Sequence, residues 1–176
     1  MKIGLISDTH DDINNVQKAI EIFKEEKVSL IIHAGDFIFP GVIDEFKKLK
    51  DELPGIRIIG VLGNNDGEKL GLLKKFMDMG GELEGEFADR EIESLRFGIY
   101  HGTSEKLREA AIKSEMYDIF IHGHTHKRRD EKIGKTLVLN PGTAHKKVKS
   151  ASGLFEEGGI IIYDTQTKEH KFVSLP

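Results

Sequence analysis

The chain has 176 residues with a formal net charge of -4 at pH 7, and it contains no cysteine. Disulfides, thiolate nucleophiles, iron–sulfur clusters and Cys-ligated zinc are therefore excluded. The acidic balance without a basic stripe also argues against general nucleic-acid binding, so an anionic substrate needs local positive charge such as bound metal.

The length predicts one compact domain, residues 1–176. The first residues, Met1 to Ser7, lack the basic start and long apolar stretch of a secretory signal, and no apolar run approaches the roughly 20 residues that span a bilayer. We expect a cytoplasmic protein with no membrane partner, and the sequence leaves open whether it forms a homo-oligomer.

The first part of the chain alternates between two hydrophobic periods. Short apolar, often β-branched runs predict strands at Lys2–Ser7, Leu30–His33, Ile56–Leu62, Leu95–Tyr100 and Ile119–His122. Apolar residues with helical spacing follow the first four of these strands, at Ile13, Val16, Ile20 and Phe23, at Val42, Ile43, Phe46 and Leu49, at Leu72, Leu73 and Phe76, and at Leu107, Ala110 and Ala111. Asp12 is placed to cap the first helix. The alternation predicts an α/β fold.

The pattern changes after His126, where strands follow one another with no helix between them. They are expected at Arg128–Ile133, Lys135–Asn140, Gly159–Asp164 and Glu169–Leu175, joined by short Gly or polar turns. We expect these strands to form a second, more antiparallel sheet. Residues 142–158 are expected to be a loop, in which Lys146, Lys147 and Lys149 form a solvated charge cluster.

Polar side chains collect where the first five predicted strands end. They are Asp8, His10, Asp36, Asn64, His101, His124 and His126. The crevice outside the carboxyl ends of the strands is where open α/β sheets bind ligands, so these positions can meet. Carboxylate, imidazole and amide oxygen are suitable ligands for divalent metals. Solvated turn residues would explain each position singly but not all of them together, so we expect a metal site.

The spacing within two of these groups gives a second argument. Asp8 and His10 are two residues apart, as are His124 and His126, and extended backbone would put both members of each pair on the same side.

The remaining histidines have simpler explanations. His33 and His122 lie inside apolar strands and are expected to be hydrogen-bonded core residues, while His145 and His170 are expected at the surface. The alternative for His145 is that it faces substrate. Asp66 either caps a helix beginning near Glu68 or supports a ligand residue.

Five short blocks in this order resemble those of the calcineurin-like metallophosphoesterase superfamily. They are Asp8-Thr9-His10, Gly35-Asp36, Gly63-Asn64-Asn65-Asp66, His101-Gly102 and Gly123-His124-Thr125-His126. The short chain and Asn65 resemble in particular its small bacterial and archaeal phosphodiesterases. The resemblance implies a four-layer αββα sandwich of two facing mixed sheets.

The resemblance also implies a ligand set for two divalent metal ions. Asp8, His10 and His126 would hold one ion, Asn64, His101 and His124 the other, and Asp36 would bridge them. Manganese is the expected metal, with nickel, iron, cobalt or zinc as alternatives. Two such ions can share a hydroxide that attacks phosphorus in line, which predicts a metal-dependent hydrolase of phosphate esters. Asp36, Asn65 and Asp66 are the expected catalytic residues.

One position departs from the superfamily pattern. Its third block usually reads Gly-Asn-His followed by Asp or Glu, and the His is thought to protonate the leaving oxygen or stabilise the transition state. Asn65 stands there in this chain, and an amide donates a hydrogen bond but no proton. We therefore expect a phosphodiesterase acting on a small phosphate diester or nucleotide-type substrate. The alternatives are a phosphomonoesterase and a non-catalytic interaction scaffold of the same fold.

Overall fold

The computed structural model describes residues 1–145 and 158–175. The described helices are α1 (Ile13–Glu25), the short 3-10 helix η1 (Pro40–Val42), α2 (Ile43–Glu52), α3 (Lys69–Asp78) and α4 (Glu105–Lys113). The described strands are β1 (Lys2–Ile6), β2 (Leu30–His33), β3 (Arg57–Gly60), β4 (Glu82–Leu83), β5 (Phe87–Ile92), β6 (Leu95–Tyr100), β7 (Ile119–Ile121), β8 (Arg129–Ile133), β9 (Thr136–Asn140), β10 (Gly159–Asp164) and β11 (His170–Ser174).

These strands form two mixed sheets. The first has the order β11-β10-β1-β2-β3-β4, in which β1 to β4 are parallel and β10 is antiparallel to both of its neighbours, β1 and β11. The second has the order β5-β6-β7-β9-β8, in which β6, β7 and β9 are parallel. The parallel strands of the first sheet end level with one another, because Ile6 pairs with His33 and His33 with Gly60. The loops that follow them therefore leave the sheet at one edge.

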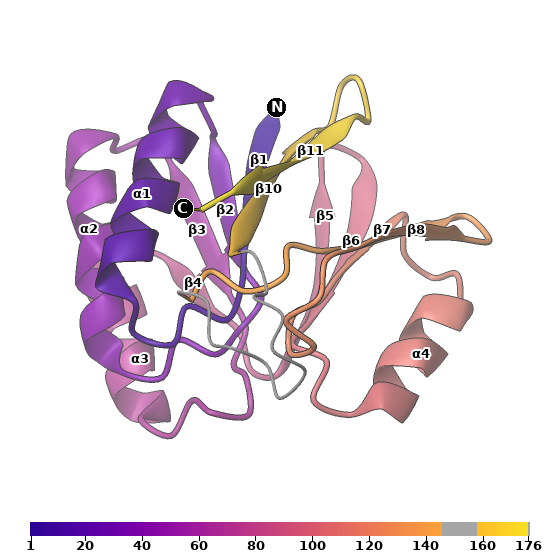
Figure 1. Cartoon of the computed structure of the whole chain (residues 1–176), viewed down its shortest axis with the longest axis horizontal. Coiled ribbons are helices and arrows are strands. Elements are labelled where there is room, and N and C mark those ends of the chain that lie inside the picture. The colour runs from indigo at the N-terminus through magenta and orange to yellow at the C-terminus, as the bar shows by residue number, and fades with distance from the viewer. Residues whose placement is uncertain (146–157, 176) are drawn as a thin grey trace.

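Three apolar layers separate the helices and sheets. One lies between the first sheet and α1 to α3, and it includes Phe23, Phe46 and Phe76. A second joins the facing sides of the two sheets, and a third lies between the second sheet and α4. Figure 1 shows α1, α2 and α3 on one side of the molecule and α4 on the other. The predicted four-layer αββα sandwich is confirmed.

The helix predictions hold best for α1. Asp12 caps it by accepting a hydrogen bond from the Asn15 amide, and Val16, Ile20 and Phe23 are buried as the spacing predicts.

The predicted apolar faces of two other helices are partly wrong. Leu73 of α3 is 41% exposed, and Leu107 of α4 is 65% exposed. The buried face of α4 instead carries Arg108 and Ile112. A helix of nine residues has too few apolar positions for the spacing to fix which side is buried.

The prediction that the four C-terminal strands form the second sheet is only partly right. β8 and β9 join the second sheet, but β10 and β11 return to the first, where β10 pairs antiparallel with β1. The free edge of β1 offers unpaired backbone groups, and a local sequence pattern does not say which edge a later strand will satisfy. The short β4 and the charged β5 were not predicted.

The predicted loop at residues 142–158 lies only partly in the described structure. Residues 142–145 have no regular secondary structure, whereas Lys146, Lys147 and Lys149 fall outside the described residues. No described helix combines the length and the apolar character that crossing a membrane requires.

Candidate metal centre

The seven predicted ligand residues meet in the loops at the carboxyl ends of the parallel strands. Asp8 follows β1 and Asp36 follows β2, and both carboxylates are buried. His10 Nε2 lies 3.7 Å from Asp8 Oδ1 and 3.7 Å from Asp36 Oδ2. These two carboxylates are the centre of the cluster, with imidazoles on both sides of them.

One group of ligand candidates consists of Asp8, His10 and His126, whose donor atoms lie close enough to share an ion. His126 Nε2 is 3.2 Å from Asp8 Oδ1, and the Nε2 atoms of His10 and His126 are 3.3 Å apart. Two imidazole nitrogens and a carboxylate oxygen thus converge on one point. A divalent cation can be bound by such a set of ligands.

A second group surrounds His101 and includes Asp8 and Asp36. His101 Nε2 lies 3.3 Å from Asp36 Oδ2 and 3.1 Å from Asn64 Oδ1. His101 Nδ1 is 2.8 Å from the carbonyl oxygen of Ala34, which can only accept, so Nδ1 carries the hydrogen. When His101 is neutral, its lone pair therefore sits on Nε2, facing the carboxylates, as metal ligation requires.

His124 completes this second side. Its ring lies beside that of His101, with the centroids 5.2 Å apart, and its backbone N–H donates to Asp8 Oδ2 at 3.1 Å. Burial lowers the pKa of His124, so the imidazole is neutral and able to donate a lone pair to a metal near pH 7.

Asp8 Oδ1 tests whether the cluster fits a cation. It is fully buried and has no hydrogen-bond partner among the described residues, although the imidazoles of His10, His101 and His126 surround it. A buried carboxylate oxygen without a partner is costly, and a metal ion would compensate it. The donor set fits divalent metals.

The electrostatics of the carboxylates agree with this. Burial alone would raise the pKa of Asp8, but the nearby His10 and His126 outweigh it and hold that pKa well below its ordinary value. For Asp36, His101 and the Asn65 donors likewise outweigh burial and lower the pKa. Both groups are ionised at neutral pH, which metal binding requires.

The backbone turns sharply at five of the seven positions. The φ angles are +53° for Asp8, +42° for His10, +59° for Asp36, +66° for His124 and +56° for His126, all in the left-handed region. The expectation that extended backbone brings each pair together is therefore wrong: tight left-handed turns do so. Such backbone costs about 1 kcal/mol or more per residue and is concentrated at functional sites.

Two glycines let these turns pack against one another. A Cβ on Gly63 would collide with the carboxylate of Asp36, and one on Gly123 would collide with Ser7 Oγ and Asp8 Oδ2. The Ser7 hydroxyl donates to Asp8 Oδ2 at 2.6 Å. Ser7 was not predicted to take part, and its only sequence signal is its place before Asp8.

Asn65 and Asp66 both hold the loop that carries Asp36. The Asn65 side chain donates to Asp36 Oδ2 at 2.7 Å, and its backbone N–H donates to Asp36 Oδ1 at 2.9 Å. The Asp66 carboxylate accepts from the backbone N–H groups of Gly63, Asp36 and Ile38. Asp66 does not cap α3, whose N-cap residue is Glu68, so that alternative is wrong.

The core histidines lie where they were expected. His33 is fully buried, accepts from the Gly35 N–H at Nδ1 and lies 3.2 Å from Thr9 Oγ1 at Nε2. His122 is buried, and its Nδ1 lies 3.0 Å from the carbonyl oxygen of Gly123 and 3.1 Å from Asn140 Nδ2.

The two histidines expected at the surface are only partly exposed. His145 packs beside His10, with ring centroids 5.7 Å apart, and therefore borders the cluster. His170 Nε2 lies 2.9 Å from Asp130 Oδ2.

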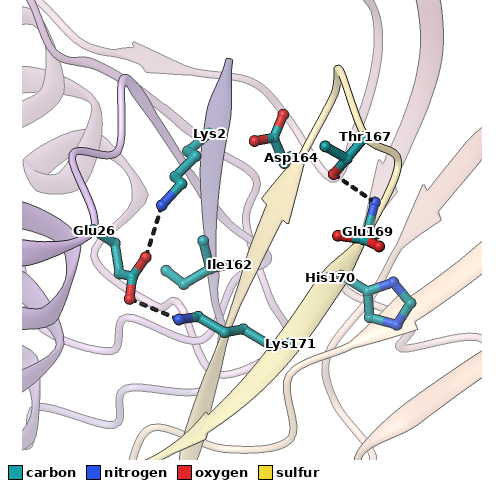
Figure 2. Close-up of a pocket in the computed structure, with 8 residues that line it drawn as sticks. All are labelled: Lys2, Glu26, Ile162, Asp164, Thr167, Glu169, His170 and Lys171. Atoms are coloured by element: carbon teal, nitrogen blue, oxygen red, sulfur yellow. Dashed lines mark hydrogen bonds and ion pairs between the residues drawn. The ribbon is translucent and has the colours of Figure 1, made fainter.

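A different pocket lies at the opposite end of the first sheet (Figure 2). It lies beside the start of β1 and the hairpin of β10 and β11. Its lysines Lys2 and Lys171 both bind Glu26, at 2.9 Å and 2.7 Å. Their charge is thus already compensated, and no cluster of metal ligands is present there among the described residues.

The fold consists of two facing mixed sheets between helices, and carboxylate and imidazole side chains gather at the strand ends. This combination defines the class of the protein as a metallophosphoesterase. The chain belongs to the calcineurin-like phosphoesterase superfamily, because the model of that superfamily domain matches residues 1–168. The resemblance noted in the sequence is confirmed.

Similar proteins agree with this assignment. The chain is 42% identical over 176 residues to the phosphodiesterase MJ0936 of Methanocaldococcus jannaschii, covering 99% of each protein. A solved archaeal phosphodiesterase is 41% identical with a TM-score of 0.86, covering 99% of this chain and 100% of that one. The phosphoesterase YfcE of E. coli, 17% identical with a TM-score of 0.65 and full coverage of both chains, shares the fold.

Proposed function

We propose that this protein is a phosphodiesterase that works with two divalent metal ions. The observation that carries the proposal is the buried Asp8 Oδ1, which has no hydrogen-bond partner among the described residues and is surrounded by imidazoles. Membership of the superfamily and the 42% identity to a protein named as a phosphodiesterase support it.

The ligand sets follow from the two sides of the cluster. Asp8, His10 and His126 would hold one ion, and Asn64, His101 and His124 the other. Asp36 is the proposed bridge, supported by the position of its Oδ2 between His10 and His101. Asp8 Oδ1 also lies within 3.9 Å of imidazoles on both sides, so two carboxylates share the central position.

The protein's own groups have distinct proposed tasks. Bound metal ions would lower the pKa of a shared water and neutralise phosphoryl charge. Asn65 would fix the orientation of Asp36 through its two hydrogen bonds, and Asp66 would fix the loop through three backbone donors. Asn65 has no acidic proton to give to the leaving group, which favours diesters with good leaving groups.

The substrate proposed is a small phosphate diester, and the metal proposed is manganese. Imidazole, carboxylate and amide oxygen ligands suit manganese, and they also accept nickel, iron, cobalt or zinc.

Metal analysis followed by a paired assay tests the proposal. The purified protein is incubated with Mn²⁺ and its metal content measured, and it is then assayed on bis(p-nitrophenyl) phosphate and on p-nitrophenyl phosphate, which share one phenol. We expect about two ions per chain, faster cleavage of the diester, and loss of activity with a chelator. Preference for the monoester would favour a phosphomonoesterase, and absence of both metal and activity would favour a binding scaffold.

A further inference from the structure

A polar pocket adjoins the proposed metal centre on the side of His124. Its lining residues come from the loop after β6, from α4 and from the loop after β7, and they are Gly102, Thr103, Glu105, Arg108, His124 and Thr125. Its volume of about 390 Å³ falls within the roughly 300–1,000 Å³ of small-molecule sites. Because His124 belongs to the proposed ligand set, a group bound in this pocket would lie next to the phosphate of a substrate at the metal centre.

Arg108 gives the pocket a fixed hydrogen-bond donor. Its side chain is only 10% exposed, and its Nε donates to Glu109 Oε1 at 3.1 Å. The same Glu109 oxygen accepts from Arg129, so the carboxylate is held on both sides. The nearest Arg108 nitrogen is 3.9 Å from Glu105, too far for a hydrogen bond, which leaves guanidinium N–H groups available to a ligand.

Thr125 supplies a second donor. Its Oγ1 accepts from Asn140 Nδ2 at 3.0 Å and from the Lys127 amide at 3.4 Å. A hydroxyl that already accepts two hydrogen bonds has its own hydrogen left to donate.

The carboxylates around the pocket decide what kind of group it can hold. Glu105 lines it with a side chain that is 82% exposed, and Glu109 lies behind Arg108. Glu109 is compensated by Arg108 and Arg129, so the lining itself carries one carboxylate and one guanidinium and has no excess positive charge to favour a bare anion. A hydroxyl group, by contrast, can accept from Arg108 and Thr125 and donate to Glu105 at the same time.

We propose that this pocket holds a sugar-like, hydroxylated substituent of the diester, the alcohol that remains on the phosphate after cleavage. This inference rests on the phosphodiesterase activity proposed above. Arg108 and Thr125 would then determine specificity by binding the vicinal hydroxyls, with Glu105 as the acceptor.

The test compares two substrates that differ only in those hydroxyls. They are the p-nitrophenyl phosphodiester at the 5-position of methyl β-ribofuranoside and its 2,3-dideoxy counterpart, which have the same leaving group. The measured quantity is the ratio of their kcat/KM values in the Mn²⁺-loaded protein. We expect the wild type to prefer the ribofuranoside by about tenfold, the effect of one or two hydrogen bonds.

Three variants separate substrate contact from structural effects. Arg108→Met and Thr125→Val should each lower the ratio several-fold toward one. Arg129→Met is the matched control, because Arg129 shares the Glu109 oxygen but does not line the pocket, and it should keep the wild-type ratio. A ratio is insensitive to a general loss of folded or metal-loaded protein.

A binding measurement gives the same comparison without turnover. The 5-methylphosphonate monoesters of the two sugars have a P–C bond in place of the scissile ester bond, and calorimetry gives their Kd values. We expect the same order of preference and the same response to Arg108→Met.

The outcomes distinguish this inference from the function on which it rests. Cleavage of neither diester by the metal-loaded wild type would overturn both. Cleavage of both with a ratio near one, or a ratio that Arg108→Met and Thr125→Val leave unchanged, would overturn the pocket assignment alone.

Discussion

Asn65 holds both carboxylate oxygens of Asp36, one through its side-chain amide at 2.7 Å and the other through its backbone N–H at 2.9 Å. The Oδ2 atom held in this way lies 3.3 Å from His101 Nε2 and 3.7 Å from His10 Nε2. Asn65, which the sequence marked as unable to donate a proton to the leaving group, thus fixes the orientation of the Asp36 carboxylate.

Asp36→Asn should disrupt both proposed metal sites, because this carboxylate faces imidazoles on both sides. We expect metal content well below that of the wild type and turnover lower by about 10²-fold or more, with an unchanged far-UV spectrum. His126→Ala is the comparison, since its Nε2 lies 3.2 Å from Asp8 Oδ1 and it belongs to one proposed ligand set, and it should weaken one site. Near-normal metal content and rate in Asp36→Asn would show that Asp8 suffices as the bridge.

Asn65→His should raise activity selectively toward poor leaving groups. With no side-chain acid, the bond to the leaving oxygen breaks with nearly full negative charge on that oxygen, so wild-type kcat/KM should fall steeply as the leaving-group pKa rises. An imidazole in the right position could recover up to ~10²–10⁴-fold for alkyl esters. The measurement is kcat/KM for a series of diesters graded by leaving-group pKa.

Asn65→Ala is the control for that series. It removes the side-chain hydrogen bond to Asp36 without adding an acid, so it should lower all rates together and leave the slope unchanged. A flat wild-type series, with chemistry limiting, would mean that another group already supplies the proton.

Asp66→Asn should destabilise the fold. The Asp66 carboxylate is buried and accepts from three backbone N–H groups, and an amide in its place would turn its NH₂ toward one or more of these donors. We expect the free energy of unfolding to fall by about 2–4 kcal/mol, measured by urea denaturation. A change below about 0.5 kcal/mol, the size of an ordinary surface effect, would contradict this role.

His33 should make stability depend on pH. Burial lowers its pKa to about 3, and the Gly35 N–H that donates to Nδ1 also opposes protonation. Because the unfolded chain binds a proton near pH 6.5, the unfolded state holds more protons below that value, and the contribution of His33 is lost as pH falls from 6.5 toward 3.

The comparison is between the wild type and His33→Asn, whose side-chain oxygen can still accept from Gly35. The variant is expected to be less stable at pH 7 but to lose about 2 kcal/mol less than the wild type between pH 7 and pH 4.5. Equal losses in the two proteins would rule out His33 as the titrating group.

The sequence pattern alone was enough to predict the helices and strands that bury a clear apolar face. It was also enough to name the residues of the proposed metal centre. Val16, Ile20 and Phe23 define α1 because side chains three and four residues apart share one side of a helix. Asp8 and Asp36 could be assigned to one place because parallel strands end at a common edge.

Tertiary structure alone decided which strands share a sheet and how the site residues are held. β10 pairs with β1 across most of the chain, and no local sequence pattern specifies that pairing. The left-handed turns at Asp8 and His124 are strained locally and persist because surrounding contacts over-determine them, such as the His124 N–H bond to Asp8. Likewise, the burial of Arg108 on α4 depends on Glu109 and the neighbouring strand, because a charged side chain is buried only where folding supplies its partner.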